Sequence, residues 1–124
     1  MSCMFFGCES LTDLTLGDSF DTSAVQDMNH MFYFCESLTE LELSGWEADE
    51  LFRTDEMFQN CRSLSKLDLS GMETSEVVNM ISMFENCEAL ETVDLSHFDM
   101  SSVEFADGMF RNCPAGEEWD HLLN

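Results

Sequence analysis

The chain has 124 residues, with 26 Asp and Glu against four Lys and Arg, which gives a formal net charge of −22 at pH 7. A surface this acidic repels nucleic acid phosphates and anionic membranes, and it attracts cations and basic partners. Apolar residues make up 44% of the chain, enough for a buried core, and the absence of any run of about 18 apolar residues argues against a membrane-spanning segment.

The motif Met-Phe-x-x-Cys occurs five times along the chain. It starts at Met4, Met31, Met57, Met83 and Met109. Successive motif cysteines are 27, 26, 26 and 26 residues apart. A period this constant indicates one supersecondary unit that is copied along the chain and buries its inner face only against its neighbours. We therefore expect one domain over residues 1–124, with repeats at about 4–30, 31–56, 57–82 and 83–108, then a partial repeat and C-terminal cap at 109–124.

In each repeat the motif is followed by a segment in which apolar and polar residues alternate, the period of a strand. The apolar positions are Leu14 and Leu16, Leu41 and Leu43, Leu67 and Leu69, and Val93 and Leu95. Farther along the first repeat, apolar residues recur at helical spacing from Val25 to Met31, and Ser23 followed by Gln26 fits a capping box. The extra residue of this repeat falls in a predicted loop at 17–19.

Strand, turn, short helix and turn in every repeat predict an α/β repeat solenoid. We expect a right-handed leucine-rich-repeat coil with one short parallel strand and one short helical segment in each 26-residue repeat, and strands about 4.8 Å apart. Pro114 interrupts the strand pattern after the last motif. Beyond it, Trp119, Leu122 and Leu123 offer apolar cover for the C-terminal end.

The repeat Met-Phe-x-x-Cys-x-Ser-Leu-x-x-Leu-x-Leu-Ser closely resembles the BspA-type leucine-rich repeats of microbial surface proteins. The resemblance is carried by Met31 to Leu38, Met57 to Leu64 and Phe20 to Val25, and it extends over roughly residues 4–113. It implies an exported or surface-displayed protein, a role in adhesion, and no shared enzymatic activity. The first residues lack the features of a signal peptide, so a surface location is expected for this chain as a segment of a longer exported protein.

The five motif cysteines are expected to form a row along the repeats. Such a row is compatible with disulfides between neighbouring repeats, with a thiolate metal site, or with small buried side chains, a common use of Cys. No Cys-x-x-Cys occurs and the histidines occupy unrelated positions, which favours the buried row. Cys3 lies outside this row and is predicted to be an exposed free thiol. The Met-Phe pairs of the motif are expected to be core packing.

Acidic residues are predicted to line the exposed face of the sheet. The candidate binding residues are Asp13, Glu40, Glu42, Asp68 and Asp94. Carboxylates held about 5 Å apart repel one another, so we expect their pKa values to rise unless cations intervene. Calcium suits oxygen ligands, but no known calcium-loop motif is present, which favours diffuse attraction of counterions. We assign no cofactor and no metal ligand.

Two further rows follow from the repeat period. Asp21, Glu47, Glu73 and Asp99 precede the expected helical segments, where they would suit the helix dipole. Ser44, Ser70 and Ser96 lie beside the sheet, where their hydroxyls are expected to satisfy backbone groups of turns. No serine has a His and an acid at equivalent positions, and phosphate-binding loops are absent, so we expect no enzymatic activity.

The sequence therefore predicts a non-catalytic protein-interaction or adhesion scaffold. Its expected partner is a protein or cell-surface ligand, a basic one, rather than nucleic acid or a membrane. The chain is expected to act as a monomer or as part of a longer protein. Two alternatives stay open: passive structural spacer repeats, and an acidic module stabilised by a cation such as calcium.

Overall fold

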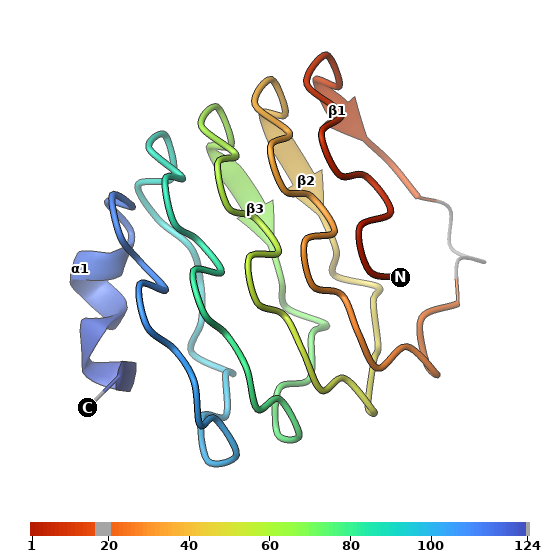
Figure 1. The fold of residues 1–124 in the computed structure, drawn as a ribbon, viewed down its shortest axis with the longest axis vertical. Coiled ribbons are helices and arrows are strands. Elements are labelled where there is room, and N and C mark those ends of the chain that lie inside the picture. The colour runs from red at the N-terminus through yellow and green to blue at the C-terminus, as the bar shows by residue number, and fades with distance from the viewer. Residues whose placement is uncertain (17–20, 124) are drawn as a thin grey trace.

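The computed structural model describes residues 1–16 and 21–123. The described part contains three short strands, β1 (Asp13–Leu14), β2 (Glu40–Glu42) and β3 (Lys66–Asp68), the helix α1 (Gly116–Trp119) and a 3-10 helix η1 (Asp120–Leu123). The strands form one open parallel sheet in the order β1-β2-β3 (Figure 1). The prediction of a leucine-rich-repeat solenoid with a strand and a helical segment in every repeat is therefore wrong. The loop predicted at 17–19 lies outside the described residues.

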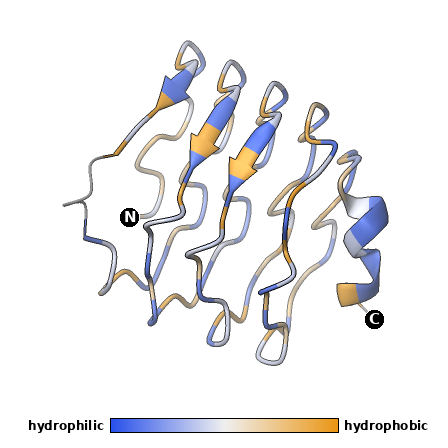
Figure 2. Cartoon of the chain, turned by 180° about the vertical axis from the view of Figure 1, so that it is seen from behind, coloured by the Kyte–Doolittle hydropathy of each residue, from blue (hydrophilic) through white to orange (hydrophobic). Residues whose placement is uncertain are grey.

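The repeat period is visible in the strand register. Asp13 pairs with Glu40, and Glu40 pairs in turn with Lys66, so equivalent residues of successive sequence repeats lie side by side. Isolated parallel bridges join Asp27, Arg53, Asn79 and Phe105 in the same way. The strands are short: β1 has two residues, and β2 and β3 have three each. In β2 and β3 a hydrophobic residue stands between two hydrophilic ones (Figure 2).

No helix forms in the described residues of the first four repeats, and the direction of the backbone hydrogen bonds explains why. The amides of Phe52 and Arg53 donate to the carbonyl of Gln26, in the preceding repeat, and Val78 donates to Phe52 in the same way. These groups are thus used between repeats, where a helix would need them within one segment. The helical spacing of apolar residues reflects successive tight turns, such as Val25 to Thr22 and Met31 to Met28.

Three of the four acids that were expected at helix starts, Asp21, Glu73 and Asp99, instead complete turns. Asp21 Oδ1 accepts the amide of Ser23 at 2.9 Å, and Asp99 Oδ1 accepts the amide of Ser101 at 2.9 Å. Hydrogen bonds of this kind, from a side chain to the backbone two residues later, stabilise turns and compete with helix formation. The capping box predicted at Ser23 is accordingly wrong.

A stack of phenylalanine rings forms the centre of the core. The rings of Phe5, Phe32, Phe58, Phe84 and Phe110 follow one another with centroids 5.3–5.6 Å apart and interplanar angles of 10° or less. Phe32, Phe58 and Phe84 are fully buried. The motif methionines pack beside them, except Met4, which is 51% exposed. The Met-Phe pair is therefore core packing in every repeat but the first.

The motif cysteines form the buried row that the sequence favoured. Cys35, Cys61, Cys87 and Cys113 are buried free thiols, and Cys8 is half-buried. Each of the thiols of Cys35, Cys61 and Cys87 donates to a phenylalanine carbonyl of the preceding repeat at 3.0–3.1 Å. Burial raises the pKa of Cys35 to about 11, and it raises the pKa of Cys61 and Cys87 further. Cys3 is exposed, as predicted.

In each repeat, two residues adopt the left-handed backbone conformation. One precedes the Met, at Cys3, His30, Glu56, Ser82 and Gly108, and the other precedes the Cys, at Gly7, Phe34, Asn60, Asn86 and Asn112, all with φ between 51° and 69°. Gly and Asn adopt this conformation at least cost. The amide groups of Asn60, Asn86 and Asn112 also form a ladder, in which each Nδ2 donates to the preceding Oδ1 at 2.7 or 2.8 Å.

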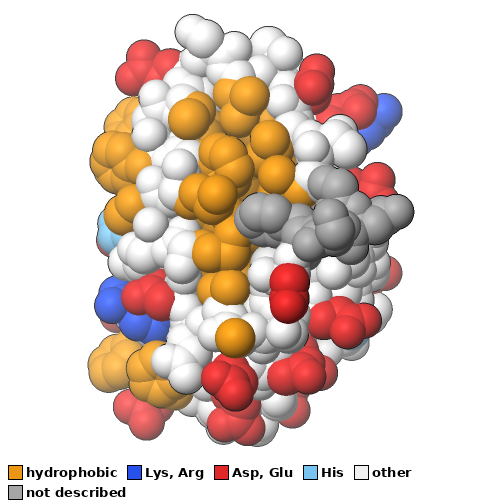
Figure 3. Space-filling view, turned by 90° about the vertical axis from the view of Figure 1, so that its right-hand side faces the viewer, with side chains coloured by type: hydrophobic (Ala, Val, Ile, Leu, Met, Phe, Trp, Pro, Cys, Tyr) orange, Lys and Arg blue, Asp and Glu red, His pale blue; other side chains and the backbone are white. Residues whose placement is uncertain are grey.

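The two ends of the stack of repeats differ. At the C-terminal end, Trp119 and Leu122 pack against the core, and the Trp119 indole donates to the Val93 carbonyl at 2.7 Å. Leu123, also predicted as cover, is 41% exposed. The opposite end shows a continuous band of hydrophobic side chains (Figure 3). The partly buried Phe5, Leu14 and Leu16 belong to this end.

Candidate functional site

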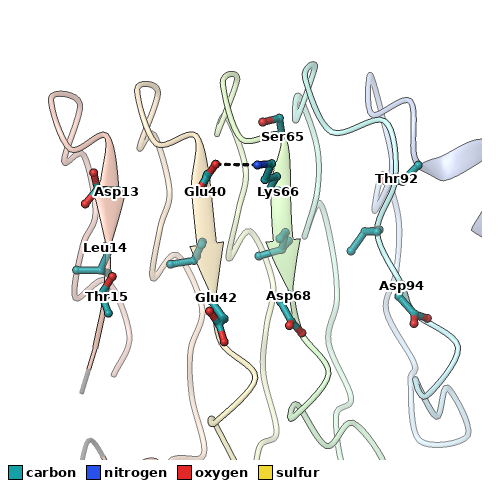
Figure 4. A pocket seen from close by; sticks show the side chains of 13 residues that line it. Asp13, Leu14, Thr15, Glu40, Glu42, Ser65, Lys66, Asp68, Thr92 and Asp94 are labelled. Carbon is teal, nitrogen blue, oxygen red and sulfur yellow. Dashed lines mark ion pairs between the residues drawn. The ribbon is translucent and has the colours of Figure 1, made fainter. Parts of the chain in front are cut away.

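The five acidic residues predicted as the binding site line one shallow depression of about 480 Å³ (Figure 4). We call Asp13, Glu40, Glu42, Asp68 and Asp94 the acidic face. All five are exposed. The first four lie in β1, β2 and β3, but Asp94 lies in an irregular segment beyond β3, so its predicted place in the sheet is wrong. The depression spans four successive segments, 13–15, 40–42, 65–68 and 92–94.

Glu42, Asp68 and Asp94 form one row on this face, which we call the carboxylate row. Glu42 and Asp68 are register partners in neighbouring strands, and Asp94 follows one repeat later. Each carboxylate accepts a hydrogen bond from a serine two residues farther along the chain. The hydroxyl of Ser44 donates to Glu42 at 2.9 Å, the amide of Ser70 donates to Asp68 at 2.9 Å, and both groups of Ser96 donate to Asp94. The hydroxyls of Ser44 and Ser96 thus donate to carboxylates, whereas the sequence predicted backbone groups of turns as their partners.

The predicted rise of the carboxylate pKa values is wrong for Asp68 and Asp94. The backbone amide of Ser70 lowers the pKa of Asp68 below its usual value, with help from the Ser70 side chain. The Ser96 side chain, followed by its amide, lowers the pKa of Asp94. Donated hydrogen bonds stabilise the charged form, and here they outweigh repulsion between neighbouring acids. Asp68 and Asp94 therefore keep their negative charges in mildly acidic solution.

The other row of the face has mixed charge. Asp13, Glu40, Lys66 and Thr92 follow one another across the strands, and we call them the mixed row. Lys66 Nζ lies 3.1 Å from Glu40 Oε1, and both side chains are well exposed (Figure 4). An exposed pair of this kind contributes little to stability. Its consequence is electrostatic: among the described residues that line this depression, Lys66 is the one Lys or Arg, and it lies beside the carboxylate row.

All four Lys and Arg side chains pair with carboxylates. Lys66 pairs with Glu40, Arg53 with Asp27 and Asp55, Arg62 with Glu36 and Glu88, and Arg111 with Glu85. All but the Arg53–Asp55 pair join residues 26 positions apart. Comparing charges at that offset would have predicted these pairs from the sequence. Within the part of the chain that the structure describes, no unpaired Lys or Arg therefore offsets the charge of the acidic face.

The comparisons with known proteins assign a family and no activity. Residues 1–119 match the family model described as "Mycoplasma protein of unknown function, DUF285". The chain belongs to this family. No match was found among curated proteins or among solved structures. The function of this DUF285 chain therefore has to be argued from its own surface.

The arrangement around Ser96 lacks the geometry of a nucleophile. The Ser96 hydroxyl donates to Asp94 Oδ1 at 2.6 Å, and His97 Nε2 lies 2.9 Å from the carbonyl of Leu69. A base that activates a hydroxyl has to accept its hydrogen bond, and here the acceptor is a carboxylate whose pKa is lowered. Asp94 and Ser96 therefore form a turn, and the Ser96 hydroxyl is bound to the carboxylate of that turn.

Within residues 1–16 and 21–123, no group of three or more His, Cys, Asp or Glu side chains is arranged to hold a metal ion. Within the same ranges, no helix has the length and apolar character that crossing a membrane requires.

An aromatic group on another surface was missed by the sequence reasoning. Phe6 stacks on Tyr33 with centroids 4.9 Å apart, and the His30 ring lies 5.3 Å from Tyr33. His30 Nε2 also lies 2.9 Å from Glu56 Oε2. Phe6 and Tyr33 are 27 residues apart, so the repeat period was again the available signal.

Proposed function

We propose that the chain is a non-catalytic protein-interaction or adhesion scaffold whose acidic face takes a basic protein partner. One observation carries the proposal: five exposed carboxylates line a single depression, while all four basic side chains are paired with acids. A surface of one sign attracts and orients partners of the opposite sign.

The net charge and the local arrangement act over different distances. The formal charge of −22 draws cations toward the whole chain, but at physiological ionic strength its effect is screened beyond about 8 Å. Selectivity therefore depends on carboxylates in direct contact with the partner. Asp68 and Asp94 suit this role because hydrogen bonds from serines fix their positions and hold their pKa values low.

The first test compares two triple variants with the same change in charge. In the row variant, Glu42→Gln, Asp68→Asn and Asp94→Asn neutralise the carboxylate row. In the control variant, Glu47→Gln, Glu73→Gln and Asp99→Asn neutralise three acids outside the depression. Binding of a Lys-rich polypeptide is measured at about 0.15 M salt, together with circular dichroism.

We expect the row variant to bind the polypeptide at least about tenfold more weakly than the parent chain, and the control variant to lose less than about twofold. Both should keep the parent spectrum. Equal losses in the two variants would mean diffuse attraction to the net charge, and the proposal would fail. That outcome would leave the spacer and the cation-stabilised module as the explanations to pursue.

A surface location is part of the same proposal. It is supported by the resemblance of the Met-Phe-x-x-Cys repeats to BspA-type repeats of microbial surface proteins. Protease added to intact cells that express the natural full-length protein should remove the epitope of this chain while a cytoplasmic marker survives. Protection of the epitope in intact cells, with cleavage after lysis, would contradict a surface location.

A further inference from the structure

We infer, on the basis of the proposed function, that the partner presents its cations from one face of an α-helix lying across the strands, over the carboxylate row. The inference names the shape of the partner, which the proposed function leaves open. It rests on the direction of the depression, the spacing of the carboxylates and the position of Lys66.

The depression is elongated across the strands. Four successive segments of the chain line it, and each contributes three or four residues. Along the strands the exposed acids are only two positions apart, as at Glu40 and Glu42. A rod-shaped element therefore meets more carboxylates when it crosses the strands than when it follows them.

The spacing of the carboxylate row favours a helix over an extended segment. Neighbouring strands lie about 4.8 Å apart, so Glu42, Asp68 and Asp94 span about 9.6 Å if Asp94 continues the strand spacing. Helix positions i, i+4 and i+7 share a face and span about 10.5 Å. Three same-face residues of an extended segment span about 13.4 Å. The helix differs from the row by about 1 Å and the extended segment by about 4 Å.

Lys66 determines which of the two rows the helix can cover. It stands between Glu40 and Thr92 in the mixed row, and its ammonium group lies 3.1 Å from Glu40. A helix with three cations would face this positive charge if it lay over the mixed row. Over the carboxylate row the same helix meets three carboxylates and no Lys or Arg of that row, and the basic group near Asp68 and Asp94 is the imidazole of His97.

The test uses three synthetic Ala-rich peptides of equal length and equal net charge. The first places three Arg at i, i+4 and i+7, on one face of the helix, and the second distributes three Arg around the helix. A third carries the spacing of the first with a central proline, which breaks the helix. Affinity for the intact chain is measured by fluorescence anisotropy at about 0.15 M salt, and helix content by circular dichroism.

We expect the one-face peptide to bind about tenfold more tightly than the other two and to gain helix content on binding. The preference should vanish in the row variant and persist in the control variant. Equal affinities for all three peptides, lost in the row variant, would overturn the helical partner and leave the proposed function standing. Affinities that the row variant does not change would overturn both.

Discussion

The Met-Phe-x-x-Cys side of each repeat and the acidic face obey the same period but differ in how strictly they repeat. On the motif side, the same ring stacking recurs from Phe5 to Phe110 with centroid distances that vary by only 0.3 Å. On the acidic face, equivalent positions carry Asp13, Glu40, Lys66 and Thr92. Charge, sign and side-chain length all vary along this row.

Burial explains this difference. A ring such as Phe58 has Phe32 on one side and Phe84 on the other, so its size is fixed by both neighbours. Residues of the acidic face contact solvent and can change singly. Repetition is thus strict where one repeat is the packing surface of the next, and the exposed face is free to acquire binding chemistry.

The largest expected effect comes from breaking the stack at its centre. Phe58→Ala should lower the free energy of unfolding by about 3–5 kcal/mol, because it leaves a cavity between two buried rings. Phe52→Ala is the control, since Phe52 is 51% exposed, and it should change stability by less than about 0.5 kcal/mol. Urea unfolding of both variants measures the difference. Similar losses in both would show that the ring stack does not dominate stability.

The buried thiols should make the protein sensitive to alkali. The pKa of Cys35 rises from 9.0 to about 11 in the folded state, so the folded chain holds its proton where the unfolded chain releases it. The contribution of this thiol to the free energy of unfolding is fully present below about pH 9 and is lost as the pH rises toward 11. The loss is at most about 3 kcal/mol.

Because other groups titrate in the same range, the comparison between parent and variant is the measurement. Urea unfolding from pH 8 to 10.5 should give a shallower loss of stability in Cys35→Ala than in the parent chain. Identical pH slopes would contradict a role for this thiol. A thiol reagent at pH 8 should also label the exposed Cys3 well before Cys61 or Cys87.

The repeat period could be read from the sequence, and with it the phenylalanine stack, the cysteine row and the grouping of acids on one face. The absence of helix from the described residues of the first four repeats could not be read in this way. Apolar residues three positions apart, such as Val25 and Met28, suit both a helix and a series of tight turns. Which of the two forms depends on backbone hydrogen bonds to the next repeat, such as that from Met28 to Arg53, and a local pattern does not contain them.

The sequence predicted which acids share the acidic face, but the predicted direction of their pKa shifts contained an avoidable error. The five acids were grouped from their repeat positions, but their pKa values were judged from repulsion alone. The spacing Asp-x-Ser, present at Asp68 and Ser70 and again at Asp94 and Ser96, predicts a turn in which the serine donates to the carboxylate. Including that signal would have predicted that the pKa values of Asp68 and Asp94 are lowered.

A smaller effect is expected where the asparagine ladder stops. Phe34 occupies the left-handed position that Asn60, Asn86 and Asn112 fill in later repeats, with φ of 60°. Phe34→Asn should relieve backbone strain and extend the ladder toward Asn60, which stabilises the chain by about 1 kcal/mol. Phe34→Ala is the control, because it keeps the strain and cannot extend the ladder. Thermal unfolding of the two variants measures the difference, and a gain in Phe34→Ala that equals the gain in Phe34→Asn would contradict this account.

The smallest expected effect sharpens the contrast on the acidic face itself. Lys66→Gln removes the cation of the mixed row and should strengthen binding of the one-face Arg peptide by about two- to fivefold, since exposed charges act weakly through solvent. It should also reduce the difference in affinity between the one-face peptide and the other two peptides, because the mixed row then accepts cations as well.

Arg62→Gln is the matched control for this prediction. It makes the same change in net charge at a residue that pairs with Glu36 and Glu88 outside the depression. An equal gain in both variants would mean that Lys66 acts only through the total charge of the chain. A gain confined to Lys66→Gln would mean that its position on the face matters, since position is the main difference between the two substitutions.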